Sequence, residues 1–290
     1  MRCSERAGAV RRLLALTLFA LVSVAAGGGS DKASRIAYTC GTPNEICVMN
    51  ADGTHVRRLT HGPSRNESPS WSPNGKRIAF HSDRDGNSEI YAMNADGSDQ
   101  RRLTNSPWNE AAPKWSPDGA TLAYVSDRGG NVEIYVMNVD GTRQVNLTKS
   151  PARDFDPAWV PNTRAFAFAS DRDGKVEVYL MDERGQVAKY SSGGAFAPAI
   201  SPDTSKLAVT GPNGIYVTKF TGGPWRRLTL GGWDTEPTWS PNGKKIAFRR
   251  GKNGPGAEIY VIDADGTGLR RLTKDSVPDG LPDWSPLPGG

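Results

Sequence analysis

A Trp-Ser-Pro phrase, extended in its fullest copies to Trp-Ser-Pro-(Asn/Asp)-Gly, recurs through this chain at nearly constant spacing. The six copies start at Trp71, Trp115, Trp159, Ile200, Trp239 and Trp284. The intervals are 44, 44, 41, 39 and 45 residues. A repeat of this length is typical of a four-stranded sheet rather than of a helix pair. The repeat therefore predicts the fold, although a repeat scaffold says less about what its surfaces bind.

Each interval contains the same four short segments, separated by turn sequences. After Trp71 come residues 76–80 (Lys-Arg-Ile-Ala-Phe), 89–94 (Glu-Ile-Tyr-Ala-Met-Asn) and 101–104 (Arg-Arg-Leu-Thr). The intervening Asp-Arg-Asp-Gly and Ala-Asp-Gly turns favour hairpins, because Gly and Asn tolerate the positive φ of tight turns. The second segment carries alanine at one register in every copy: Ala37, Ala79, Ala123, Ala167, Ala208 and Ala247. A small side chain at that position suits the crowded contact between neighbouring sheets.

The two ends of the chain are out of phase with the repeat. Residues 35–60 supply the second, third and fourth segments, whereas residues 281–286 supply a Trp-Ser-Pro segment with nothing after it. Joined, they complete one further sheet. We therefore expect an all-β, six-bladed β-propeller of four-stranded antiparallel blades over residues 35–286. Its ring would be closed by the C-terminal strand, which removes an open sheet edge.

The first 26 residues resemble a secretory signal peptide. Four arginines precede the apolar run Leu13–Ala26, and small and polar residues follow it. We expect cleavage after residue 26, a short linker at 27–34, and a periplasmic, secreted or cell-surface protein with no membrane span after cleavage. The alternative is an uncleaved anchor helix, but the run is shorter than the roughly 20 residues that cross a bilayer.

Export affects how the two remaining cysteines are interpreted. Cys40 and Cys47 flank a short turn, and an oxidising compartment favours a disulfide between them. Two buried thiols are the alternative. Two cysteines alone do not supply the four ligands of a structural zinc site.

Net charge gives no support for nucleic-acid binding. The whole chain carries +5, but residues 1–26 hold four arginines and one glutamate, which leaves +2 for the rest. The basic residues are spread through the Arg-Arg-Leu-Thr segments rather than gathered in one stripe. We expect no nucleic-acid partner.

Several repeated phrases together resemble those of one known family. Ile-Ala-Phe, Ser-Asp-Arg-Asp-Gly-Asn, Glu-Ile-Tyr-Val-Met-Asn and Arg-Arg-Leu-Thr, with Trp-Ser-Pro-Asp-Gly, are similar to those of TolB-type six-bladed propellers. Similar repeats form the propeller of dipeptidyl-peptidase and prolyl-oligopeptidase relatives. The resemblance covers residues 35–286. It also implies an α/β domain before the propeller in TolB, and a hydrolase domain with a Gly-x-Ser-x-Gly turn in the peptidases. We expect neither here, because only about eight residues separate the predicted signal peptide from the first strand and no such turn occurs.

In an up-and-down blade, the turns between strands two and three lie at the same end as the connections between blades. The residues that lead into each innermost strand should therefore converge on the mouth of the central channel, where several loops can contact one ligand. The candidate ligand-binding residues are Arg65, Glu67, Trp108, Asn109, Glu110, Arg153, Asp154, Phe155, Asp156, Trp233, Asp234 and Glu236. Trp108 and Trp233 stand outside the repeat phrase and suit a binding surface. Packing between blades is the alternative for both.

We expect a non-catalytic, monomeric module that binds an envelope or extracellular protein, peptide or glycan through this mouth. The alternative is a propeller hydrolase or lyase that cleaves a saccharide with carboxylates at the mouth. Against it, only three histidines occur, and His61 alone belongs to the mouth side. We expect no catalytic residue, no cofactor and no metal, because the Asp-x-Asp-Gly sequences suit turns better than a calcium loop.

Overall fold

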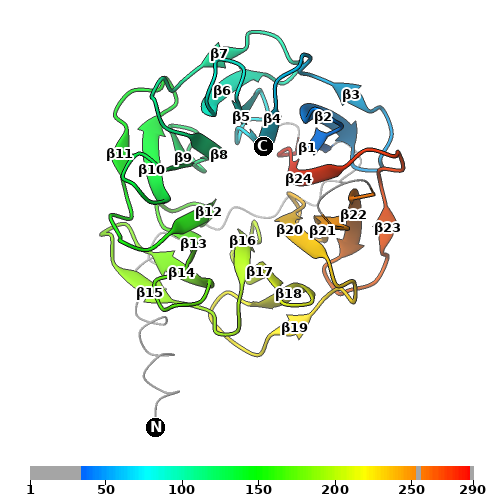
Figure 1. Cartoon of the computed structure of the whole chain (residues 1–290). Helices are drawn as coiled ribbons and strands as arrows, with labels where there is room; N and C mark the ends of the chain where they lie inside the picture. Colours follow the sequence, from blue (N-terminus) through cyan, green and yellow to red (C-terminus); the bar gives the residue numbers. More distant parts are fainter. Residues whose placement is uncertain (1–33, 253–255, 288–290) are drawn as a thin grey trace.

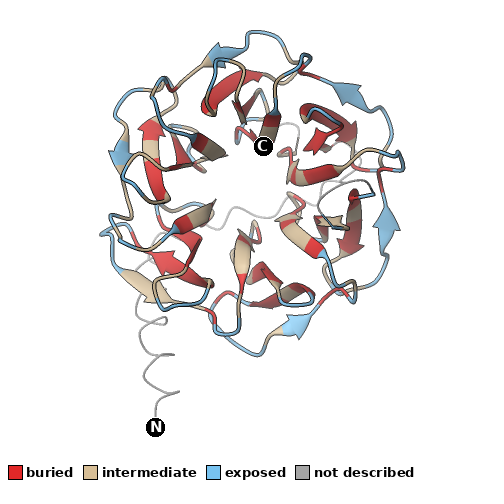
Figure 2. Cartoon of the chain, in the orientation of Figure 1, coloured by how far each residue is buried: buried red, intermediate tan, exposed pale blue. Residues whose placement is uncertain are grey.

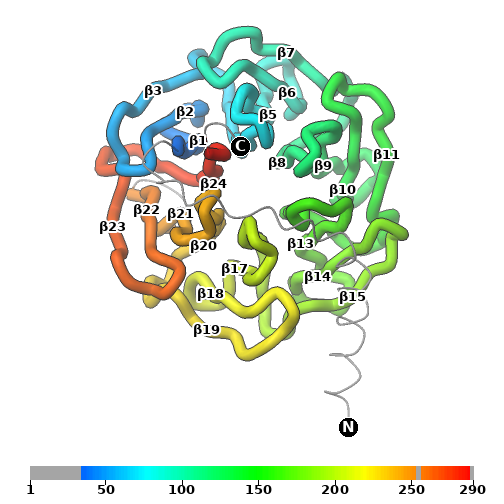
Figure 3. Tube along the Cα trace, turned by 180° about the vertical axis from the view of Figure 1, so that it is seen from behind, coloured from blue at the N-terminus to red at the C-terminus, as the bar shows by residue number. Residues whose placement is uncertain are grey.

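Six four-stranded antiparallel sheets are arranged in a ring in the computed structural model, which describes residues 34–252 and 256–287 (Figure 1). We call the sheets blades 1 to 6. The view from behind shows the same circular order, and the last strand lies beside the first (Figure 3). The prediction of an all-β, six-bladed propeller is confirmed. None of the described residues belongs to a helix long and apolar enough to cross a membrane.

Each blade runs from an innermost strand to a short outermost one. Blade 1 consists of β24 (Asp279–Trp284), β1 (Arg35–Cys40), β2 (Glu45–Asn50) and β3 (Arg57–Arg58). Blade 2 consists of β4 (Asn66–Trp71), β5 (Arg77–Ser82), β6 (Glu89–Asn94) and β7 (Arg101–Arg102). Blade 3 consists of β8 (Glu110–Trp115), β9 (Thr121–Ser126), β10 (Glu133–Asn138) and β11 (Val145–Asn146).

The other three blades repeat this plan. Blade 4 consists of β12 (Asp154–Trp159), β13 (Phe166–Ser170), β14 (Glu177–Met181) and β15 (Val187–Lys189). Blade 5 consists of β16 (Phe196–Ile200), β17 (Lys206–Gly211), β18 (Gly214–Lys219) and β19 (Arg226–Arg227). Blade 6 consists of β20 (Asp234–Trp239), β21 (Lys245–Arg250), β22 (Glu258–Asp263) and β23 (Arg270–Arg271).

The core lies between neighbouring blades. Six clusters of buried apolar side chains each combine residues of two adjacent blades. The repeated alanine of the second strand lies in the cluster shared with the next blade; Ala79, for example, packs with Leu122 and Tyr124 of blade 3. Larger side chains there would push the blades apart, which explains the fixed small residue. The outermost strands are mostly exposed, and burial increases in the middle strands (Figure 2).

Every innermost strand contains a β-bulge just before its proline. The pairing register shifts there in all six blades. The residue before the proline has a positive φ of 47° to 59°: Ser68, Ala112, Asp156, Ala197, Glu236 and Leu281. Such a conformation is costly for residues other than glycine, and the surrounding structure fixes it. The bulge changes the direction of the neighbouring side chains, which include several candidate residues.

Ring closure follows the predicted arrangement. β24 pairs with β1 so that Trp284 lies opposite Ile36 and Asp279 lies opposite Cys40. Cys40 and Cys47 form a disulfide with Cα atoms 5.9 Å apart. The predicted signal peptide at 1–26 lies outside the described residues, as does the predicted linker apart from Ser34.

Candidate functional site

The residues that lead into the innermost strands are held by the turns between the second and third strands. The backbone N–H of Arg65 donates to the Asp83 carboxylate at 2.7 Å, and the Asp83 N–H donates to the Arg65 carbonyl at 3.3 Å. The same pair of bonds joins Asn109 to Asp127. We call the end of the ring that carries these turns and the blade connections the connection face. Its lead-in backbone is fixed by hydrogen bonds, so side chains there are presented from a rigid support.

Arg153 follows the same rule, because its N–H donates to the Asp171 carboxylate at 2.9 Å. In blade 6 the Gly251 N–H donates to the Trp233 carbonyl at 3.2 Å. The four tethered residues come from connections that enter blades 2, 3, 4 and 6. The connection face therefore presents one anchored lead-in residue from each of these blades.

Five of the predicted site residues are exposed on the connection face: Arg65, Trp108, Asn109, Arg153 and Trp233. Trp108 is 45% exposed and Trp233 is 58% exposed, unlike the repeat tryptophans Trp71 and Trp239 at 5% and 6%. Trp108 precedes blade 3 and Trp233 precedes blade 6. These junctions are three blades apart in a six-bladed ring, so the two indoles lie on opposite sides of the axis.

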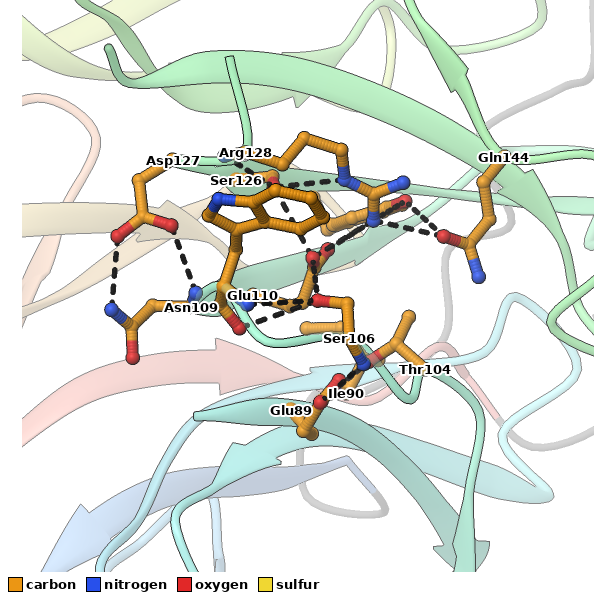
Figure 4. Close-up of polar contacts among 12 residues, drawn as sticks. Glu89, Ile90, Thr104, Ser106, Asn109, Glu110, Ser126, Asp127, Arg128 and Gln144 are labelled. Carbon is orange, nitrogen blue, oxygen red and sulfur yellow. Dashed lines mark hydrogen bonds and ion pairs between the residues drawn. The ribbon is translucent and has the colours of Figure 1, made fainter. Parts of the chain in front are cut away.

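Three predicted site residues are buried in ion pairs instead. Glu110 is fully buried, and both of its oxygens accept from Arg128 Nη2 at 2.8 Å (Figure 4). It also accepts from the Ser106 and Ser126 hydroxyls. Burial raises the pKa of Glu110, whereas Ser106 and Arg128 act in the opposite direction. A carboxylate with its oxygens occupied in this way is a structural group rather than a ligand contact.

Asp154 and Asp234 repeat the arrangement. Asp154 accepts from Arg172 at 2.9 and 3.0 Å, and Asp234 accepts from Arg250 at 2.6 and 2.8 Å. Both are at most 1% exposed. These three acids are therefore buried, whereas the residues that directly precede them in the chain are exposed.

The arginine partners were missed by the sequence analysis, which took the Asp-Arg-Asp-Gly sequence only as a turn. Arg128 lies over the ring of Tyr135 at 4.6 Å, and Arg172 lies over Tyr179 at 4.8 Å. The available signal was the similar separation between the inner-strand acid and the turn arginine, which is 18 residues for Glu110 and Asp154 and 16 residues for Asp234. Such an arginine combines a charge pair with stacking on an aromatic face.

The remaining predicted residues, Glu67, Phe155, Asp156 and Glu236, lie half-buried on the innermost strands. Asp156 of blade 4 interacts electrostatically with Glu236 of blade 6 and Lys114 of blade 3. Glu236 also interacts with Glu67 of blade 2. Since charges from four blades influence one another, they face the common centre of the ring. We call Glu67, Asp156 and Glu236, together with the charged residues that face them, the axial charges.

Three further axial charges were not predicted: Lys114, Arg249 and Asp283. Lys114 Nζ lies 3.8 Å from Asp283, and Arg249 Nη2 lies 3.5 Å from Glu236. His81 Nε2 lies 3.6 Å from Glu67, and the proximity of His81 is the main cause of the lowered pKa of Glu67. Lys114 keeps 35% of its side chain exposed, so water reaches this region.

The axial carboxylates also join successive blades. Asp156 accepts the N–H of Ala197 at 3.1 Å, and Asp283 accepts the N–H of Trp71 at 2.8 Å. Glu236 accepts the N–H of Leu281 at 2.7 Å. Burial raises the pKa of Asp156 to about 6 and also raises that of Glu236. Each of these acids thus accepts a backbone donor of the next blade through one of its oxygens.

Comparison with known proteins agrees with this architecture. The profile of the TolB beta propeller domain family matches residues 30–111, 103–195 and 182–288. The chain belongs to this family. As a TolB-type propeller it is 43% identical over 75 residues to the Tol-Pal system protein TolB 1 of Novosphingobium aromaticivorans, a match that covers 25% of the chain and 16% of that protein.

A second relative of this TolB-type propeller carries a peptidase name. The uncharacterized peptidase YuxL of Bacillus subtilis is 40% identical over 76 residues, which are 25% of this chain and 11% of that protein. Among solved structures, TolB from Acinetobacter baumannii superposes with a TM-score of 0.79 at 24% identity. That match covers 89% of this chain and 68% of the other, and it shows a shared fold.

Proposed function

We propose that this chain is an exported, non-catalytic, monomeric module that binds a protein or peptide on its connection face. The observation that carries the proposal is the pair of exposed tryptophans, Trp108 and Trp233, on opposite sides of the axis. Aromatic side chains with a polar edge are enriched among the residues that dominate binding energy. Two such anchors on a rigid ring suit a partner that lies across the centre.

Polar groups beside the indoles supply orientation. Arg65, Asn109 and Arg153 are exposed, and their backbones are held by the neighbouring turns. A prearranged surface loses little conformational entropy on binding, which favours affinity. Guanidinium and amide groups recognise carboxylates and backbone carbonyls of a peptide.

The state of the carboxylates supports binding rather than catalysis. A saccharide hydrolase needs two carboxyl groups that flank the scissile bond. Glu110, Asp154 and Asp234 are buried against arginines, and Asp156 and Glu236 accept backbone N–H groups of the next blade. These carboxylates make contacts that hold the propeller together, which leaves them poorly placed to act on a substrate.

Two observations support export. The sequence at residues 1–26 has the pattern of a signal peptide, and the Cys40–Cys47 disulfide suits an oxidising compartment. A relative named as a Tol-Pal system protein supports a partner in the cell envelope.

The test is cross-linking capture from the exported fraction of the native cells, read by mass spectrometry. We compare the wild type with Trp108→Ala/Trp233→Ala and with a matched control, Val56→Ala/Leu269→Ala, which removes two exposed apolar side chains near outermost strands. The expected result is a protein partner retained by the control and reduced at least about tenfold in the tryptophan variant. Equal capture by all three chains, or binding only to an envelope glycan, would contradict the proposal.

A further inference from the structure

A buried polar residue occupies the first position of the innermost strand at five of the six blade junctions. At the first position of β8, Glu110 has Arg128 as its cation and the Ser106 hydroxyl as a donor at 2.8 Å. Asp154 and Asp234 have Arg172 and Arg250. In β4 the residue is the neutral Asn66, which accepts from Arg84 at 2.7 Å. An arginine therefore serves this position in blades 2, 3, 4 and 6.

Blade 1 has an acid at this position without the arginine. Asp279 begins β24 and is 2% exposed, yet neither of its carboxylate oxygens has a hydrogen-bond partner. The turn between β1 and β2 is Gly-Thr-Pro-Asn, which contains no arginine. A buried carboxylate without partners is costly, so a native structure with one calls for an explanation.

In blade 1, the Cys40–Cys47 disulfide occupies the place where Arg128 packs in blade 3. Cys40 pairs with Asp279, in the register where Ser126 pairs with Glu110. Cys47 pairs with Tyr38, in the register where Tyr135 pairs with Tyr124. In blade 3, the arginine lies over both of these tyrosines and bonds to that serine. The cysteines thus occupy the positions of two side chains that hold the arginine in blade 3. Blade 1 has no such arginine, so Asp279 lacks the charge compensation that Glu110 receives.

The second compensating group is also replaced, and by another acid. Ser106 lies four residues before Glu110 and donates its hydroxyl to it. The residue four positions before Asp279 is Asp275. A donor in the connection between blades has therefore become a third carboxylate, which increases the negative charge instead of relieving it.

Three carboxylates meet at the junction of blade 6 with blade 1. One oxygen each from Glu258, Asp275 and Asp279 lies within 4.8 Å of the others. Arg271 pairs with Glu258, and the Thr273 hydroxyl donates its single hydrogen to Glu258 at 2.6 Å. Among the described ion pairs, only Glu258 of the three carboxyl groups is therefore matched by a cation.

The cluster is accessible from solvent. Asp275 is exposed and lines a groove of about 550 Å³, together with Tyr38, Arg271 and Thr273. Asp279 does not itself line the groove, but one of its oxygens lies within 4.8 Å of an oxygen of Asp275, which does. The groove lies between blade 6 and blade 1, away from the axial charges.

We propose that Glu258, Asp275 and Asp279 bind a calcium ion that ties blade 6 to blade 1. Only oxygen ligands are offered, which suits a hard cation and disfavours zinc and copper. The carboxylates come from a strand, a connection and a second strand, and water in the groove can complete the shell of six to eight oxygens that calcium accepts. Magnesium requires near-ideal octahedral geometry and dehydrates reluctantly, so it fits this set less well. The ion supplies the positive charge that arginine supplies in four other blades.

The test is calorimetric titration with CaCl₂ and thermal unfolding, after removal of metal with EDTA and dialysis. We compare the wild type with Asp279→Asn, with Asp275→Ser and with the matched control Asp140→Asn, which neutralises an exposed turn carboxylate in blade 3. Asp275→Ser introduces serine, the residue found at the equivalent position, Ser106, in the connection that enters blade 3. The variant is therefore expected to fold normally.

In 5 mM CaCl₂ we expect the unfolding midpoint of the wild type and of Asp140→Asn to rise by about 2 to 4 °C. Asp279→Asn and Asp275→Ser should show no such rise and no binding heat. Absence of heat and of a shift in the wild type would overturn the proposal, as would equal shifts in all four chains. An equal response to 5 mM MgCl₂ would overturn the assignment to calcium.

Discussion

Asp156 in blade 4 accepts the backbone N–H of Ala197 in blade 5 at 3.1 Å while facing Glu236 across the centre of the ring. The bond favours the ionised carboxylate, but burial has the larger effect and raises the pKa of Asp156 to about 6. An unfolded chain releases this proton at about pH 3.9. The folded state therefore retains a proton between these values, and that contribution to stability is lost as the pH rises from about 4 to 6.

Asp156→Asn removes this titration and keeps an oxygen that accepts the Ala197 N–H. We expect the variant to match the wild type near pH 4 and to exceed its free energy of unfolding by about 3 kcal/mol above pH 7. Urea unfolding at pH 4, 6 and 7.5 measures the difference. A difference that does not change with pH would contradict the assignment to Asp156.

Replacing Arg128 with alanine should destabilise blade 3 strongly. The change leaves Glu110 buried without a cation and removes stacking on Tyr135. We expect a loss of about 3 kcal/mol in the free energy of unfolding, measured by urea denaturation. The double variant Arg128→Ala/Glu110→Gln should recover part of this loss, because no unpaired charge remains. If it recovers nothing, stacking rather than charge compensation explains the effect.

A chain that ends at Gly280 should lose thermal stability. It lacks four residues of β24, including Trp284, so β1 becomes an open edge and Ile36 loses its cross-strand partner. We expect the unfolding midpoint to fall by at least about 10 °C in calorimetry, because several buried side chains become exposed. A synthetic peptide of residues 279–287 should restore part of the loss, whereas a scrambled peptide should not. A truncated chain as heat-stable as the intact one would contradict closure by β24.

Cys40→Ser/Cys47→Ser removes the covalent link between β1 and β2. The two cysteines are seven residues apart, and a loop of this size restricts the unfolded chain by about 2 to 3 kcal/mol. We expect a fall of about 4 to 8 °C in the unfolding midpoint, measured by calorimetry. The wild type assayed under reducing conditions should fall by a similar amount, and an unchanged midpoint in both would contradict a stabilising role.

The fold could be predicted because each blade depends on local features that recur. The turn glycines and the fixed alanine register appear in the sequence, and the incomplete end segments together make one blade. The bulge before each proline was not predictable in the same way. Residues that precede proline avoid helical conformations, yet nothing in the sequence marks the positive φ of Asp156 or Glu236.

The candidate site was harder to predict because neighbours in sequence differ in burial. Asn109 is exposed and Glu110 is fully buried, although both precede the same proline. The difference arises from Arg128, whose guanidinium reaches Glu110 from a turn 18 residues later. Asp279 looks like Asp154 and Asp234 in sequence, and only the missing turn arginine distinguishes its environment.

The pairing of β24 with β1 also determines the order in which the blades can fold. Ile36 and Trp284 are 248 residues apart, so this contact closes nearly the longest loop that the chain allows. Local hairpins within blades 2 to 6 form early, whereas blade 1 is completed only after its innermost strand, β24, has been synthesised. A nascent chain on the ribosome therefore carries an open array of blades, and the ring closes only after translation has passed Trp284.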